Sequence, residues 1–283
     1  MKKEPYTTPC STSNPGLIVI IGDSSHSMIG EKNEVLNDSF NYFVNELIFT
    51  NGNGRKIKDN LYLCFIEYGG DGGDTAKILR QGFLSEFTNN PIGFKQINSS
   101  IINGDIFPDG NEQTMPVFVN YQAKGATATS NAFSIAADVI TRFVAIHPDS
   151  PAPKVIHITD GHPWSNQYKF EEVNRTNKAA SKLTSIGTTD GNTILFNLHI
   201  IGENDDKKEP QYFFPEKGTE ILGYGNRILE SLSVVIPPIY VANAKKFGMT
   251  LGENPMSFAT NVDAKHILKF IMFGSSSMTD RMS

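Results

Sequence analysis

The sequence predicts an α/β protein with a three-layer, doubly wound architecture, whose mostly parallel central sheet has one antiparallel edge strand. Short apolar runs of strand length alternate along the chain with amphipathic stretches of helical period. The first run, Leu17 to Ile21, is continuously β-branched and aliphatic, which is typical of a strand covered on both faces in a parallel sheet. Helices are therefore expected on both sides of the sheet.

The first strand is followed by a helix and two more strands. Apolar residues recur at helical spacing from Glu31 to Phe49, and Asn51-Gly-Asn-Gly ends this helix because both residue types tolerate left-handed backbone. Leu61 to Tyr68 is the second predicted strand. After the turn at Asp71, Lys77 to Phe83 is predicted to return as the antiparallel edge strand.

The later elements repeat this alternation of strand and helix. They are, in order, a helix from about Thr129 through Val144, a strand at Lys154 to Thr159, a helix at Asn166 to Ser185, a strand at Thr193 to Ile201, a helix near Ile221 to Leu232, a short strand at Ser257 to Thr260 and a final helix with Ile267 to Met272 facing inward. This regular alternation favours a doubly wound sheet over separate α and β domains.

Residues 16–283 are predicted to form a single large domain after a flexible tail at 1–15, since 283 residues suffice for one large core. The tail is polar and has no periodic apolar face. Periodicity is weak at 89–122 and 202–255, which are predicted to be irregular insertions, with a short helix around 92–102 in the first.

Composition narrows the possible functions. The net charge is −5, so a nucleic-acid partner, for which a basic patch is needed, is not expected. No apolar run reaches transmembrane length, and the first residues lack the apolar segment of a signal peptide. Cys10 and Cys64 do not suggest a disulfide framework. We therefore expect a cytoplasmic protein without a membrane partner.

Polar side chains follow the first strand at alternate positions. Asp23, Ser25 and Ser27 stand in the loop between this strand and the next helix. Ligands of open α/β sheets bind at the carboxyl ends of strands, where this loop lies. One carboxylate and two hydroxyls suit a small hard cation such as Mg²⁺, which takes oxygen ligands.

Two further loops carry oxygen side chains at the same predicted edge. Thr127 precedes a helix in Gly125-Ala-Thr, and Asp160 follows a buried strand in Thr159-Asp-Gly. Simpler interpretations remain open, because Asp23 also suits a helix cap and Asp160 a turn before glycine. Thr129 competes with Thr127 for the ligand position.

With these three loops in this order, the sequence resembles the von Willebrand factor type A (vWA) domain. The metal-ion-dependent adhesion site (MIDAS) of that family uses a D-x-S-x-S loop, a later threonine and the aspartate of a T-D-G type turn. The resemblance implies Mg²⁺ or Mn²⁺, or else Ca²⁺, as the ion. It implies metal ligands at Asp23, Ser25, Ser27 and Thr127, with Asp160 bound directly or through water.

The resemblance also implies a function without catalysis. An open coordination position on the metal accepts an acidic residue of a partner protein. The stretch Thr159-Asp-Gly-His-Pro resembles intracellular bacterial members associated with tellurite resistance and with kinase or phosphatase partners. One departure is His26, which stands where the family often has glycine, a residue that is easier to place if the backbone needs a positive φ.

An enzymatic interpretation competes with this one. Gly22-Asp-Ser after a strand resembles the opening of GDSL-type (SGNH) serine esterases, which implies Ser24 as the nucleophile. The same resemblance implies Asn204 in the oxyanion hole and the pair Asp263 and His266 as its base. The oxyanion block falls late for that family, and Asp263 lies at the start of an amphipathic helix. A third possibility is a scaffold that kept the fold and lost the metal.

Overall fold

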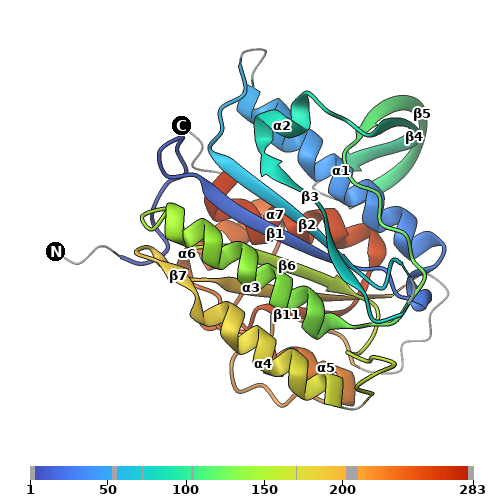
Figure 1. Ribbon diagram of the computed structural model, residues 1–283, viewed down its shortest axis with the longest axis vertical. Helices are drawn as coiled ribbons and strands as arrows, with labels where there is room; N and C mark the ends of the chain where they lie inside the picture. The colour runs from blue at the N-terminus through green and yellow to red at the C-terminus, as the bar shows by residue number, and fades with distance from the viewer. Residues whose placement is uncertain are drawn as a thin grey trace.

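The computed structural model describes residues 4–52, 56–71, 73–102, 105–169, 171–201 and 210–279. A seven-stranded sheet forms its centre (Figure 1). The strands of this sheet are β1 (Gly16–Asp23), β2 (Leu61–Tyr68), β3 (Ala76–Phe83), β6 (Lys154–Thr159), β9 (Ile194–Ile201), β10 (Tyr212–Phe213) and β11 (Phe258–Asp263). Their order is β10-β11-β9-β6-β1-β2-β3.

The five inner strands run parallel, whereas β3 and β10 run antiparallel at the two edges. The predicted mostly parallel sheet with β3 as an antiparallel edge strand is therefore confirmed. The second edge strand, β10, is only two residues long and had no signal in the sequence. From β3 to β11 the order is that of the doubly wound fold, in which the strand order reverses beside β1 and opens a ligand crevice at the carboxyl ends.

Helices cover both faces of the sheet. One face carries α1 (Glu31–Gly52), α2 (Leu84–Thr88), α6 (Pro238–Ala244) and α7 (Ile267–Thr279), and the other carries α3 (Thr129–Ile146), α4 (Glu171–Ser185) and α5 (Tyr224–Ser231). Figure 1 shows α3 and α4 in front of the sheet and α7 behind it. The predicted three layers are thus present. Three single-turn helices, η1 (His26–Met28), η2 (Lys245–Phe247) and η3 (Ala264–His266), stand in the connections between these elements.

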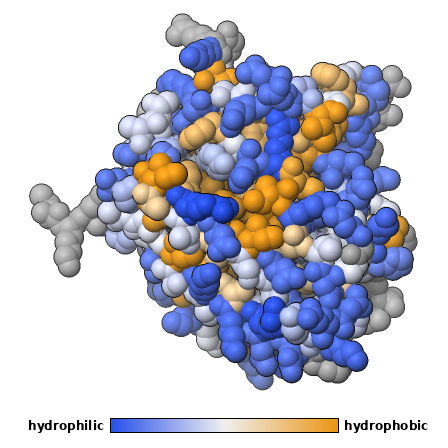
Figure 2. Space-filling model, in the orientation of Figure 1, coloured by the Kyte–Doolittle hydropathy of each residue, from blue (hydrophilic) through white to orange (hydrophobic). Residues whose placement is uncertain are grey.

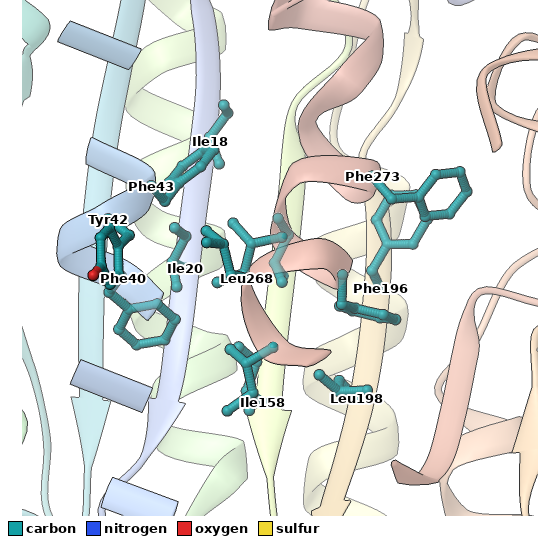
Figure 3. Packing of buried hydrophobic residues seen from close by; sticks show 14 of the residues in the cluster. Ile18, Ile20, Phe40, Tyr42, Phe43, Ile158, Phe196, Leu198, Leu268 and Phe273 are labelled. Atoms are coloured by element: carbon teal, nitrogen blue, oxygen red, sulfur yellow. The ribbon is translucent and has the colours of Figure 1, made fainter. Parts of the chain in front are cut away.

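Alternate residues of β1 enter two separate cores. Ile18 and Ile20 face the α1 and α7 side, whereas Leu17, Val19 and Ile21 face the α3 side. All five are fully buried, as the continuous apolar run predicts. Figure 3 shows the first core, where side chains from α1 and α7 close over Ile18 and Ile20. The strand is therefore fixed on both faces, which holds its polar end, Asp23, in a defined position.

The first predicted insertion is regular structure. The helix expected around 92–102 is wrong, because β4 (Gly93–Ile102) pairs antiparallel with β5 (Asp105–Val117) in a separate two-stranded sheet. Ile97 and Met115 are buried against the main core. A short apolar run does not distinguish helix from strand, and here long-range pairing and burial decided. A second small pair, β7 (Gly187–Thr188) with β8 (Gly191–Asn192), forms the turn after α4.

The second predicted insertion lies partly outside the described residues, at 202–209. The helix expected near Ile221 to Leu232 is confirmed as α5. The structure adds α6, which the sequence analysis missed although Pro238 stands at its first turn. Proline suits the first turn of a helix, because the backbone N–H groups of that turn have no acceptor within the helix and the N–H that proline lacks is not needed.

The structure contradicts the expected flexible tail for residues 4–15. Thr8 and Cys10 are buried, with exposed fractions of 6% and 0%. The carboxylate of Asp190, itself 2% exposed, accepts hydrogen bonds from the backbone N–H groups of Thr7 and Thr8 at 2.9 and 2.8 Å. The segment is therefore held by a buried acceptor that is far away in the chain. The polar composition of the segment itself did not indicate this anchoring.

The face of the molecule that carries α3 and α4 is largely hydrophilic (Figure 2). Figure 2 shows the face that carries α3 and α4, on which charged and polar residues surround a patch of apolar side chains near the middle. Within the part of the chain that the structure describes, no helix has both the length and the apolar character needed to cross a bilayer. Cys10 and Cys64 are buried thiols that form no disulfide, and burial raises the pKa of Cys64 to about 12.

Candidate metal centre

The first loop begins at the carboxyl end of β1. Oδ1 of Asp23 accepts the backbone N–H of Ser25 at 2.7 Å, which closes a turn directly after the strand. Ser25 forms a parallel bridge with Gly125, and the N–H of His26 donates to the carbonyl of Gly125 at 2.8 Å. The first and second predicted loops are thus joined by backbone hydrogen bonds.

The third loop begins at the carboxyl end of β6, the strand next to β1. Oγ1 of Thr159 donates to Oδ2 of Asp23 at 2.6 Å and accepts the N–H of Gly161 at 3.1 Å. Both oxygens of Asp23 therefore have fixed partners. Thr159 orients the aspartate, a role that the sequence analysis missed although the residue belongs to the Thr159-Asp-Gly turn.

A chain of hydroxyls connects the first loop to the third. Oγ of Ser25 and Oγ of Ser27 are 3.0 Å apart, and Oγ of Ser27 donates to Oδ1 of Asp160 at 2.7 Å. Asp23, Ser25, Ser27 and Asp160 therefore form one connected cluster at the carboxyl edge of the sheet. The hydrogen bond from Ser27 to Asp160 and the one from Thr159 to Asp23 join residues of different loops or strands, so the folded sheet assembles this cluster.

Thr127 lies beside the third loop. The backbone carbonyl of Thr127 accepts the backbone N–H of Trp164 at 3.0 Å. Its side chain is directed toward Gly161, because a Cβ atom added to that glycine would lie 3.9 Å from Oγ1 of Thr127. The competing residue, Thr129, is 1% exposed and its hydroxyl donates to the carbonyl of Thr127 at 3.3 Å. Of the two threonines, Thr127 is therefore the one whose hydroxyl faces the Asp160 loop. All five residues of the predicted site lie at this edge.

The cluster concentrates negative charge in a buried place. Asp23 is 0% exposed, and the side chain of Asp160 is 1% exposed. Burial, and then the charge of Asp160, raise the pKa of Asp23 to about 6, because both effects disfavour its ionised form. The ammonium group of Lys32, at 2.5 Å from Oδ2 of Asp160, partly compensates this charge.

The donor set fits a hard divalent cation. Two carboxylates and three hydroxyls are oxygen ligands of the kind that Mg²⁺, Mn²⁺ and Ca²⁺ prefer. No group of three or more His, Cys, Asp and Glu side chains that could hold a metal occurs among the described residues, so a nitrogen- and sulfur-rich site is absent from that part of the chain. The raised pKa of Asp23 also fits, since a bound cation would offset the burial and the repulsion by Asp160 that raise it.

His26 is accommodated without strain. It lies exposed in η1, and it is not among the described non-glycine residues with positive φ. The left-handed position of this loop falls later, at Gly30 with φ of 96°. The absence of glycine between the two serines therefore does not distort the loop.

The geometry does not favour the esterase interpretation. Ser24 is 0% exposed, and its hydroxyl donates to Oε1 of the buried Glu67 at 3.0 Å. Asp263 accepts the backbone N–H of Lys265 at 3.1 Å and forms an ion pair with its ammonium at 2.9 Å. Asn204 lies outside the described residues. A nucleophile must reach its substrate and a base, and Ser24 instead points into the protein against a carboxylate.

A buried polar network lies directly beneath the cluster. The hydroxyl of Tyr68 lies 3.0 Å from Nε2 of His157, and Nδ1 of His157 lies 3.0 Å from Oδ1 of Asn197. Burial lowers the pKa of His157 to about 4, so the imidazole is neutral near pH 7. Burial, and then the charge of Asp23, raise the pKa of the Tyr68 phenol. His157 is thus a packed residue, as its strand position predicted, and Tyr68 is a neighbour of the site that the sequence analysis missed.

Exposed apolar or aromatic side chains lie on three segments that adjoin the loops of the cluster. We call Ile29, Trp164 and Tyr224 the rim; their exposed fractions are 55%, 43% and 56%. Ile29 follows the first loop, and the N–H of Trp164 binds the carbonyl of Thr127. Tyr224 contacts the ring of His162, which follows Asp160 by two residues, at a centroid distance of 5.7 Å.

No protein-family model and no curated protein matches the chain. Among solved structures, a pilus adhesin, SpaC, from Lactobacillus rhamnosus GG is similar over 70% of this chain and 26% of its own, at 12% identity and a TM-score of 0.42. Proximal thread matrix protein 1 from the mussel byssus, with a zinc-occupied MIDAS motif, is similar over 68% of this chain and 37% of its own. The sequence identity is 12% and the TM-score is 0.35.

The von Willebrand factor domain of the type V pili tip protein Mfa5 from Porphyromonas gingivalis is similar over 54% of this chain and 42% of that one, at 13% identity and a TM-score of 0.26. The chain thus spans between about a quarter and two fifths of the three structures named. At these identities and scores, the likenesses do not bear on the function of this chain.

Proposed function

We propose that this protein is a metal-dependent protein-binding module of the vWA type and not an enzyme. In this proposal, Mg²⁺ or Mn²⁺ is held by Asp23, Ser25, Ser27 and Thr127, with Asp160 bound directly or through water. The observation that carries it is the connected cluster of Asp23, Ser25, Ser27 and Asp160, built from two strand ends where the sheet order reverses.

The residues around the cluster would prepare it for the cation. Thr159 and the N–H of Ser25 fix the two oxygens of Asp23. Ser27 is exposed, so the cluster opens to solvent on one side. When bound, the ion would supply a Lewis-acidic position that is open to a further oxygen ligand. A carboxylate of a partner protein would fit that position, because it supplies a further oxygen ligand of the kind that these cations prefer.

The rim supports a protein as the partner. Ile29, Trp164 and Tyr224 expose large apolar side chains beside the polar cluster. Protein interfaces are enriched in aromatic residues, and their central contacts are apolar with polar groups that set specificity. We therefore propose that the partner presents an Asp or Glu with apolar residues next to it.

A narrower assignment is also part of the proposal. The resemblance of Thr159-Asp-Gly-His-Pro to intracellular bacterial, tellurite-resistance-associated proteins supports a cytoplasmic stress or signalling assembly with kinase or phosphatase partners. This support comes from the sequence alone. The choice of Mg²⁺ over other divalent cations likewise rests on the oxygen donors.

A random-peptide display library tests the proposal directly. The immobilised protein is panned in Mn²⁺ and eluted with EDTA. Peptides that elute should share an Asp or Glu flanked by apolar residues, and Asp160→Ala should enrich none of them in a metal-dependent way. Asp149→Ala, an exposed aspartate after α3, is the matched control and should behave as wild type. Equal enrichment by wild type and Asp160→Ala would refute the metal-bridged mechanism.

A further inference from the structure

A lysine occupies the anionic face of the cluster. Lys32 is the second residue of α1, directly after the first loop, and its Nζ lies 2.5 Å from Oδ2 of Asp160. The pair is largely hidden from solvent, with exposed side-chain fractions of 13% for Lys32 and 1% for Asp160. Since water screens such a pair poorly, the interaction is stronger than an ordinary surface ion pair.

Both oxygens of Asp160 are engaged in this arrangement. Oδ1 accepts the hydroxyl of Ser27 at 2.7 Å, while Oδ2 faces the ammonium. A divalent cation that uses Asp160 must therefore either displace the ammonium from Oδ2 or bind next to it. In both cases, the positive charge of Lys32 opposes entry of the metal.

We propose that Lys32 is a tethered cation that weakens metal binding in the absence of a partner and couples the metal to the partner's carboxylate. This inference rests on the proposed metal site and adds the residue that sets its affinity. With Asp23 and Asp160 ionised, the formal charge of the cluster with Lys32 is −2 + 1 = −1. A divalent cation changes it to −1 + 2 = +1, and a partner carboxylate then brings it to 0.

Without Lys32, the same count of formal charges favours binding of the metal without a partner carboxylate. The cluster would carry −2, a divalent cation would neutralise it, and an added carboxylate would leave −1. Lys32 thus shifts the neutral state from the metal complex to the ternary complex of metal and carboxylate. Because coupling between two ligands is reciprocal, a carboxylate should tighten metal binding in wild type by the same factor by which metal tightens carboxylate binding.

Titration of Mn²⁺ into the metal-free full chain, followed by calorimetry and by the paramagnetic resonance of free Mn²⁺, tests this inference. Lys32→Met and Lys32→Gln should bind Mn²⁺ at least about tenfold more tightly than wild type. The Gln variant keeps a hydrogen-bond donor near Asp160, so it serves if the Met variant does not fold. Lys32→Arg should bind Mn²⁺ like wild type, because it keeps the positive charge. Lys95→Met is the control and should also bind like wild type, since it removes only an ion pair to Asp38, a residue further along α1.

The coupling is measured by repeating the titrations in saturating acetate as the probe carboxylate. Acetate should tighten Mn²⁺ binding in wild type and have a smaller effect in Lys32→Gln. Equal Mn²⁺ affinity in wild type and both neutral variants, or weaker binding in the variants, overturns the role of Lys32 and leaves the metal site standing. If neither wild type nor any Lys32 variant binds Mn²⁺ more tightly than Asp160→Ala does, the proposed function itself fails.

Discussion

Ser27 and Asp160 are 133 residues apart in the chain, and the hydroxyl of Ser27 donates a 2.7 Å hydrogen bond to Oδ1 of Asp160. This contact joins the loop after β1 to the loop after β6. Neither loop alone contains enough oxygen ligands for a divalent cation. A metal at this edge would therefore bind the folded chain and not the unfolded one, and it would raise the stability by mass action.

Mg²⁺ or Mn²⁺ should stabilise the wild type. At a hundredfold excess over Kd, the free energy of unfolding should rise by about 2.7 kcal/mol, because the ion binds the native state only. Thermal unfolding in chelator and in millimolar metal measures the effect. Asp160→Ala should unfold at the same temperature in both solutions. A metal-dependent rise of equal size in this variant would show that the ion binds elsewhere.

Asp23→Asn should lose the metal response and gain stability in chelator. The pKa of Asp23 is raised to about 6 in the folded chain, so its ionised form destabilises the native state above that pH. Removing the charge should therefore raise the free energy of unfolding at pH 7 by roughly 1–3 kcal/mol. In the wild type, this penalty should fade as the pH falls from about 6 to about 4. Urea unfolding in chelator measures both effects, and a less stable variant would contradict the prediction.

Trp164→Ala should weaken binding of the acidic peptides selected in Mn²⁺ without weakening Mn²⁺ binding itself. The indole is 43% exposed beside Thr127, so truncation removes apolar contact area and no proposed ligand. A loss of about 1–2 kcal/mol in peptide affinity is expected for an interface aromatic residue. Ile146→Ala, at the far end of α3 with 72% exposure, is the control. Equal effects of the two variants would argue against the rim.

The stability of the wild type should rise between about pH 7 and about pH 8.5 because of Lys154. This lysine is 1% exposed, and burial lowers its pKa to about 7, whereas the unfolded chain keeps the proton to near pH 10. The unfolded state thus binds more protons in this window, and the free energy of unfolding should increase with pH by on the order of 1–2 kcal/mol. Urea titrations at the two pH values measure it, and Lys154→Met should show a flat profile. A parallel rise in the variant would assign the effect to another group.

Asp190→Ala should release the segment 4–15. Oδ1 of Asp190 accepts hydrogen bonds from the backbone and hydroxyl of Thr8, and Oδ2 accepts the N–H of Ala152 at 3.1 Å. Removing this buried acceptor leaves backbone donors unpaired, which should cost about 2–4 kcal/mol. Limited proteolysis should then cut within 4–15, as followed by mass spectrometry. The exposed Asp149→Ala should change neither stability nor cleavage, and resistance of Asp190→Ala to cleavage would show that other contacts hold the segment.

The amino-acid pattern alone was enough to predict the layers and the edge of the sheet where the candidate site lies. Continuous apolar runs such as Leu17 to Ile21 require burial on both faces, so they predict inner strands wherever they occur. Once the strands are parallel, their carboxyl ends share one edge. The placement of Asp23, Ser25, Ser27, Thr127 and Asp160 near one another followed from that rule and from the three motifs.

The contacts between residues that are distant in the chain could be seen only in the folded protein. The chain at 93–117 pairs as two strands because Ile97 and Met115 find the same core, and its short apolar runs do not specify helix or strand. Thr8 is buried because Asp190 supplies an acceptor 182 residues away. Lys32 meets Asp160 only because β1, which leads into α1, pairs with β6, the strand before Asp160. The residues next to a lysine or a threonine in the sequence do not reveal which distant residue it will contact. Hydrogen bonds and ion pairs of this range therefore cannot be predicted from the local sequence.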